Sequence, residues 1–202
     1  MRNIVASEFV TLDGVMESPE KWQLGEGMQF FSDDMAKYSL DQVKSADSLL
    51  LGRVTYELFA GAWPSIQDEE GFADRMNSLP KHVVSSTLKE AEWNATLIGK
   101  NVMDEIAQLK MESGQDILLL GSAELVRSLT EAGLIDEYRI WVHPVVYGRG
   151  KRLFKNGTGA TVLALTSTRT FESGVVMLTY KPSAPTDEQG RWRHPDVGST
   201  TK

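Results

Sequence analysis

The sequence lacks cysteine, has only three histidines, and contains no apolar run long enough to span a membrane. The absence of cysteine excludes disulfide bonds, thiolate nucleophiles and cysteine-ligated metals. The histidines, His82, His143 and His194, lie far apart in the chain and do not form the H-E-x-x-H spacing of a zinc-binding helix. We therefore expect no metal site.

Basic residues are also scarce, because 21 Lys and Arg stand against 28 Asp and Glu, a formal net charge of −7. Nucleic-acid binding relies on a basic surface that neutralises phosphates, so this balance argues against DNA or RNA as the main partner. It still allows a local basic pocket for a phosphorylated small molecule. Arg2 and Glu8 interrupt the first apolar stretch too early for a signal peptide, so we expect a cytoplasmic protein that does not bind membranes.

The composition, 202 residues with 41% hydrophobic and 24% charged side chains, is typical of one folded domain. Residues 1–182 alternate between strand-like and helix-like segments, which indicates an α/β fold. Residues 183–202 are rich in Pro, Ser, Thr, Asp and Gly and are expected to form a polar tail. We expect strands at 4–10, 48–51, 82–85, 95–98, 116–120, 138–146, 162–165 and 175–180, and helices at about 33–43, 55–59, 101–111 and 122–132.

Two junctions between a strand, a glycine and a helix are candidates for ligand binding. At the first, Gly52 is followed by Arg53 and Thr55; at the second, Gly121 is followed by Ser122. A glycine lets backbone amides approach a ligand, and a helix N-terminus offers unpaired N–H groups and a positive dipole end. Because ligands of open α/β sheets bind beyond the carboxyl ends of the strands, the two junctions could together hold a pyrophosphate. The alternative is that both are ordinary tight turns.

Three segments resemble known reductases. Residues 121–154, which begin Gly-Ser-Ala-Glu-Leu-Val, resemble the reductase domain of bacterial riboflavin biosynthesis, and Thr11-Leu-Asp-Gly14 is similar to a Ser-Leu-Asp-Gly loop of that family. Gly52-Arg-Val-Thr-Tyr56 is similar to the Gly-Arg-x-Thr turn of dihydrofolate reductase, which has the same fold. The resemblance covers residues 2–181. It implies a dihydrofolate-reductase-like α/β fold, with a mostly parallel central sheet flanked by helices, antiparallel C-terminal strands and bound NADPH.

The resemblance also implies positions for the cofactor. The backbone of Ala6 would meet the nicotinamide carboxamide, and Ser85 and Ser86 would lie near the adenosine 2′-phosphate. A plain polar strand end is the alternative for these two serines. The remaining cofactor contacts would come from the two junctions, at Gly52, Arg53, Thr55, Gly121, Ser122, Ala123, Glu124 and Leu125.

The substrate side is less well defined. Asp13, beside the expected nicotinamide, is the candidate to donate a proton or orient the substrate, with Glu17 and Glu26 as weaker alternatives; a simple Asp-Gly turn is the competing interpretation. Leu120 stands where the riboflavin-pathway reductase has a substrate-binding Glu, and Gly27 stands where dihydrofolate reductase has its protonating carboxylate. The candidates for the walls of an aromatic substrate pocket, otherwise core residues, are Trp22, Phe30, Phe31 and Trp63.

Three functions remain open from the sequence. The first is an NADPH-dependent reductase of a small heterocyclic or carbonyl substrate. The second is the riboflavin-pathway 5-amino-6-(5-phosphoribosylamino)uracil reductase, and the third is a non-catalytic nucleotide-binding module. The resemblance also implies a homodimer that pairs through the region of the apolar strand residues Ile140, Trp141 and Val142, although these residues could simply be core.

Overall fold

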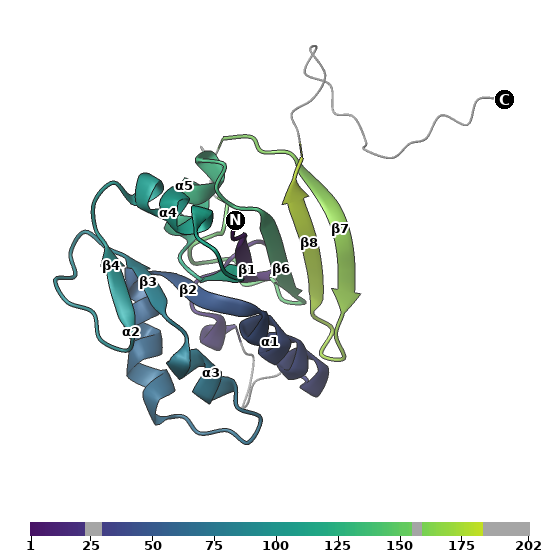
Figure 1. Ribbon diagram of the computed structural model, residues 1–202. Coiled ribbons are helices and arrows are strands. Elements are labelled where there is room, and N and C mark those ends of the chain that lie inside the picture. The colour runs from purple at the N-terminus through teal and green to yellow at the C-terminus, as the bar shows by residue number, and fades with distance from the viewer. Residues whose placement is uncertain (23–29, 155–158, 184–202) are drawn as a thin grey trace, which may run out of the picture.

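The computed structural model describes residues 1–22, 30–154 and 159–183, and within these parts of the chain eight strands form one sheet (Figure 1). The strand order is β4-β3-β2-β5-β1-β6-β8-β7. The predicted tail lies almost entirely outside the described residues. The strands are β1 (Ile4–Thr11), β2 (Ala46–Gly52), β3 (Lys81–Val84), β4 (Ala95–Ile98), β5 (Asp116–Leu120), β6 (Glu137–His143), β7 (Leu163–Thr170) and β8 (Val176–Pro182).

The strands from β4 to β6 run parallel, whereas β8 is antiparallel to β6 and β7 is antiparallel to β8. The predicted fold class, a mostly parallel sheet with antiparallel C-terminal strands, is therefore confirmed. The β7–β8 hairpin turns at Gly174, as expected. This residue has φ +81°, and the turn closes through a 2.9 Å bond from the Phe171 amide to the Val175 carbonyl.

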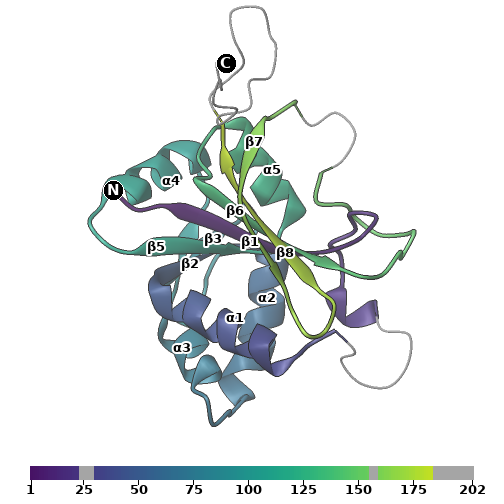
Figure 2. The ribbon, with the colours of Figure 1, turned by 90° about the vertical axis from the view of Figure 1, so that its right-hand side faces the viewer.

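Helices cover both faces of the sheet, with α4 and α5 on one side and α1, α2 and α3 on the other (Figures 1 and 2). Strand β1 contributes side chains to both layers, because its side chains alternate between the two faces of the sheet. Ile4, Ala6 and Val10 pack with α4 and α5, whereas Val5 packs with the other helical layer. The helices are α1 (Asp33–Ser45), α2 (Arg53–Ala62), α3 (Phe72–Ser78), α4 (Val102–Met111) and α5 (Ala123–Glu131), with short 3₁₀ turns η1 (Pro19–Lys21) and η2 (Trp63–Ser65).

Several boundaries differ from the prediction. Strand β6 ends at His143 and not at residue 146, because Pro144 has no N–H to donate to a ladder. Strand β7 runs to Thr170, well beyond residue 165, through mostly exposed polar residues whose pairing with β8 is a tertiary effect. Helix α3 was not predicted, because its seven residues bury only Ala73 and Met76 and give no helical period.

Trp141 belongs to the core. It is fully buried, its Nε1 donates to Ser7 Oγ at 2.9 Å, and its ring stacks on Phe171 with 4.9 Å between the centroids. Its neighbours Ile140 and Val142 alternate to the opposite face and are only partly buried. Of the three residues predicted at a dimer interface, Trp141 therefore cannot contribute a contact surface.

Candidate functional site

The two predicted glycine turns lie against each other. Strands β2 and β5 are parallel neighbours, so their carboxyl ends reach the same edge of the sheet. A Cβ added to Gly52 would lie 2.6 Å from Ser122 Cβ and closer still to its Oγ. Conversely, a Cβ added to Gly121 would lie 2.6 Å from Thr55 Oγ1. Each glycine thus leaves room for the hydroxyl side chain of the other turn, and the structure brings four of the predicted residues together.

Both turns lead directly into helix N-termini. Helix α2 begins at Arg53 and α5 at Ala123, and neither N-cap residue, Gly52 or Ser122, makes a side-chain cap hydrogen bond. The first amides of each helix have no intrahelical acceptor, so they are available to an anion. Helix α2 has no acidic residue in its first turn, whereas α5 has Glu124 there. The α2 end is therefore the more favourable of the two for a phosphate.

Arg53 is paired within its own helix. Its Nη1 lies 3.0 and 2.8 Å from the two carboxylate oxygens of Glu57, and both side chains are roughly half exposed. An exposed pair of this kind contributes little to stability and can be exchanged for a stronger partner. The predicted phosphate contact of Arg53 stays a prediction, and it requires the guanidinium to leave Glu57 or to bind both groups.

Ser85 has a structural role. It is buried, and its Oγ accepts hydrogen bonds from the amides of Thr87 at 3.2 Å and Leu88 at 3.0 Å, which fixes the chain after β3. This hydroxyl oxygen therefore accepts within a local turn, which fits the alternative of a plain polar strand end; its predicted role near a 2′-phosphate stays a prediction. Ser86 is exposed directly after it and keeps the predicted role open.

Strand β1 separates from β5 at this same edge. Its pairing with β5 ends at Ser7 opposite Leu120, whereas its pairing with β6 continues to Thr11 opposite His143. The β5-facing edge beyond Ser7 therefore has no β5 residue opposite it. Ala6 lies before this point, wholly buried between Leu119 and Tyr138. The part of the β1 edge that β5 leaves unpaired thus begins after Ala6. The predicted contact between the Ala6 backbone and the cofactor stays a prediction.

Glu8 was missed by the sequence reasoning and lies at the point of separation. Its side chain is 1% exposed, and its Oε2 accepts a 3.0 Å hydrogen bond from the Gly121 amide. Its Oε1 is buried without a hydrogen-bond partner among the described residues. Burial raises the pKa of this carboxyl well above its ordinary value, which favours the neutral acid; the Gly121 bond opposes this only partly. The sequence did contain a signal for this residue, because Glu8 is an acidic residue at a core-facing position of an apolar strand.

Asp13 anchors the first loop. Its Oδ1 accepts from the Thr11 hydroxyl at 2.6 Å and from the Tyr147 amide at 3.1 Å, and its Oδ2 accepts from the Gly148 amide at 2.9 Å. The Thr11 hydroxyl and these amides lower the pKa of Asp13 to about 2. A carboxylate that is ionised at neutral pH holds no proton to donate, which favours the competing interpretation of a turn residue. The predicted role of Asp13 in donating a proton or orienting the substrate stays a prediction. Asp13 ties the first loop to the segment after β6.

The predicted aromatic walls meet at His143. Trp22 is 5.3 Å from the His143 ring and Phe30 is 6.1 Å from it, between centroids. Trp22 is also almost fully buried and donates its Nε1–H to the Glu17 carbonyl at 3.0 Å, so it packs as core and does not line an open pocket. Burial lowers the pKa of His143, whose Nδ1 lies 3.0 Å from the Trp141 carbonyl, so a neutral ring with a proton on Nδ1 fits best.

The other residues predicted on the substrate side do not belong to the aromatic cluster around His143. Phe31 is 42% exposed, and Trp63 packs near Phe59 and Phe72 on the opposite helical layer, away from the His143 cluster. The Glu17 carboxylate accepts from the Lys151 amide at 3.1 Å and holds the loops together. Glu26 and Gly27 lie outside the described residues.

The family model of the RibD C-terminal domain matches residues 2–177. The chain belongs to this family. It is 35% identical over 185 residues to the uncharacterized protein YyaP of Bacillus subtilis (strain 168), an alignment that covers 89% of this chain and 94% of YyaP.

Solved structures agree on the fold of this RibD C-terminal domain. A protein from Shewanella sp. PV-4 ascribed to riboflavin biosynthesis superposes with a TM-score of 0.69 at 20% identity, covering 91% of this chain and all of that one. Dihydrofolate reductase from Enterococcus faecalis, solved with NADP(H), superposes with a TM-score of 0.57 at 14% identity, covering 90% of this chain and 97% of that one. The predicted dihydrofolate-reductase-like fold is confirmed.

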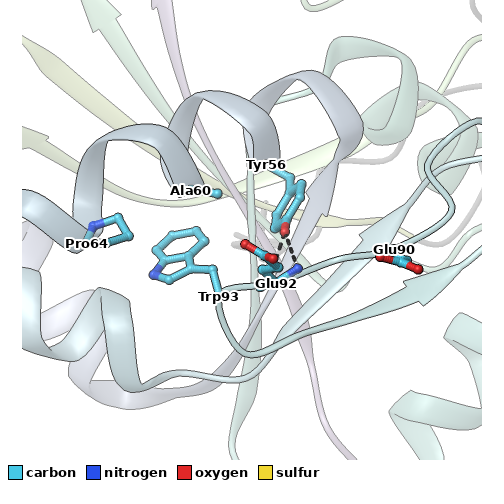
Figure 3. Close-up of a pocket in the computed structure, with 6 residues that line it drawn as sticks. All are labelled: Tyr56, Ala60, Pro64, Glu90, Glu92 and Trp93. Carbon is cyan, nitrogen blue, oxygen red and sulfur yellow. Dashed lines mark hydrogen bonds between the residues drawn. The ribbon is translucent and has the colours of Figure 1, made fainter.

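A hollow of about 510 Å³ in this RibD C-terminal domain lies beside α2 and is lined by none of the predicted cofactor residues (Figure 3). The Tyr56 hydroxyl donates to the Glu92 carbonyl at 3.0 Å and accepts from the Glu92 amide at 2.8 Å. These two hydrogen bonds tie the start of α2 to the β3–β4 connection and so help to hold the first glycine turn in place. The hollow is lined by Tyr56, Ala60, Pro64, Glu90, Glu92 and Trp93.

Among the described residues of this RibD C-terminal domain, no group of three or more His, Asp or Glu side chains is placed to hold a metal ion. No helix in these parts of the chain has the length and apolar character to cross a membrane.

Proposed function

We propose that this member of the RibD C-terminal domain family is an NADPH-dependent reductase of a small heterocyclic or carbonyl compound. The observation that carries the proposal is the contact between the two glycine turns. It sets two helix N-termini side by side at the sheet edge where β1 and β5 separate. The family match and the dihydrofolate reductase fold support a reductase of the riboflavin or folate type.

The residues present fit a dinucleotide phosphate. Neither Gly52 nor Gly121 has a Cβ, so the two turns pack closely while the first amides of α2 and α5 stay available to the pyrophosphate. Arg53 and Ser86 are the exposed groups at this edge that could contact further phosphate oxygens. NADPH, when bound, supplies the hydride. The protein's part is to position the cofactor and to exclude water.

The substrate side offers less to argue from. Trp22 and His143 are buried, so only the partly buried rings of Phe9 and Phe30 beside His143 leave aromatic surface that could meet a flat substrate. The second candidate function is the riboflavin-pathway uracil reductase, which the family match favours. Growth of a riboflavin auxotroph carrying this gene would support the second candidate. NADPH binding without turnover across a broad substrate panel would instead support a non-catalytic module.

The cofactor assignment is tested with two variants that break the same ion pair. Arg53→Ala removes a charge-assisted contact to phosphate worth roughly 1.5–3 kcal/mol, so NADPH affinity should fall about 10- to 150-fold. Glu57→Gln breaks the Arg53–Glu57 pair but keeps the guanidinium, so it should bind NADPH at least as tightly as the wild type. Fluorescence titration measures both, with NADH as the weaker-binding comparison. Equal affinities of all three proteins for NADPH would remove Arg53 from the site.

A further inference from the structure

The end of the β1–β5 ladder depends on a side chain. Alternate residues of a parallel strand bond to the same neighbour, and the Ile117 amide donates to the Asn3 carbonyl at 2.8 Å. Continued in register, the donors of β5 are Ile117, Leu119 and then Gly121, whose backbone acceptor would be the Ser7 carbonyl. The Gly121 amide instead donates to Glu8 Oε2. Glu8 therefore takes the next donor of the ladder and ends the strand pairing at this residue.

The turn that follows needs to be held. Gly121 has φ +68° and Ser122 has φ +67°, two successive left-handed residues of which the second carries a Cβ. Left-handed backbone is unfavourable for a residue with a side chain and persists where its surroundings fix it. The buried Glu8 carboxyl, bonded to the first of the two residues, is a fixed point of this kind. The conformation of these two residues then sets the direction in which the first amides of α5 point.

We propose that Glu8 is a positioning residue of the cofactor site, which draws the Gly121 amide out of the β1–β5 ladder and fixes the Gly121–Ser122 turn so that the first amides of α5 face the cofactor phosphates. This inference rests on the proposed function. Burial favours the neutral acid, so Glu8 can hold the amide beside an anionic ligand without like-charge repulsion. Its apolar surroundings, which include Ala6 and Val10 on the same face of β1, are consistent with that neutral state.

Two variants of similar size separate positioning from other roles. Glu8→Gln keeps an oxygen that accepts from the Gly121 amide, and Glu8→Leu removes that acceptor while filling the space with apolar atoms. Two ligands are titrated: NADPH, and 2′-phospho-ADP-ribose, which has the phosphates but no nicotinamide. We expect Glu8→Leu to weaken both ligands by a similar factor, about tenfold. Glu8→Gln should stay within about threefold of the wild type for both.

Glu8→Leu binding both ligands as tightly as the wild type would overturn the proposal. So would a loss confined to NADPH, because it would place the carboxyl against the nicotinamide and not behind the phosphate turn. Ser173→Ala is the matched control. Ser173 Oγ is likewise buried without a partner in the described parts of the chain, but it lies in the β7–β8 hairpin. Its removal should change neither affinity.

A measurement without ligand keeps this proposal distinct from the proposed function. Hydrogen exchange of the Gly121 amide, followed by NMR, should be faster in Glu8→Leu than in the wild type and restored in Glu8→Gln. If the wild type binds neither ligand, the NADPH assignment fails, and the exchange rates alone decide whether Glu8 fixes the turn. Equal exchange of Gly121 in all three proteins would overturn the positioning role.

Discussion

The contact between the two glycine turns predicts a specific clash and a specific rescue. In Gly52→Ala the new Cβ would lie 2.6 Å from Ser122 Cβ and nearer still to its Oγ, whereas the next atom, Ser122 Cα, is 4.0 Å away. Ser122 must move, although its left-handed backbone leaves it little freedom. Overpacking of this kind costs about 1–3 kcal/mol of folding free energy. For a chain of this length each kcal/mol corresponds to a Tm change of roughly 2–4 °C.

The rescue is Ser122→Gly, which removes both clashing atoms. Glycine accepts φ +67° without strain, so this variant alone should be close to neutral. In its background the Gly52→Ala Cβ meets only the Cα at 4.0 Å, an ordinary contact. The cost of Gly52→Ala should therefore largely disappear, with a coupling energy between the two sites of about 1–3 kcal/mol.

The coupling energy comes from a double-mutant cycle of the wild type, Gly52→Ala, Ser122→Gly and the double variant. Urea denaturation followed by tryptophan fluorescence measures the stability of each. Gly61→Ala is the control, because a Cβ at Gly61 of α2 meets nothing within 4 Å and should stabilise the helix by up to about 1 kcal/mol. If Gly52→Ala costs the same with serine and with glycine at position 122, the two turns do not touch. The structural basis of the proposed cofactor site would then be wrong.

Two further predictions concern the first loop and assembly. The pKa of Asp13 is lowered to about 2 by Thr11, Tyr147 and Gly148. Its stabilising effect is therefore complete above the unfolded pKa of about 4 and is lost as the pH falls toward 2. Asp13→Asn should thus melt below the wild type at pH 7, with a gap that closes toward pH 2; a gap independent of pH would refute the anchor role. For assembly, we propose a homodimer through the partly buried face of β6 that carries Ile140 and Val142. Light scattering should give twice the monomer mass for the wild type and the monomer mass for Ile140→Asp.

The elements whose cause is local could be predicted from the sequence. Alternating apolar segments predicted the parallel strands, and Gly52 and Gly121 marked the turns, because backbone freedom and helix starts are encoded within a few residues. Helix α3 and the exposed part of β7 were not predicted from the sequence, since neither has a periodic pattern of apolar residues. The family resemblance added the dihydrofolate-reductase-like fold and NADPH as the expected cofactor, which spacing alone had left open.

The roles of the side chains at that edge depend on tertiary contacts. Asp13 was the candidate to donate a proton or orient the substrate. The nearby Thr11 hydroxyl lowers its pKa most, and the amides of Tyr147 and Gly148, more than 130 residues away, add to this and make the residue a loop anchor. Glu8 looked like an interruption of an apolar strand, but it holds the Gly121 amide, 113 residues away. Protonation and hydrogen bonding depend on burial and on partners that are distant in the chain, and a local pattern contains neither.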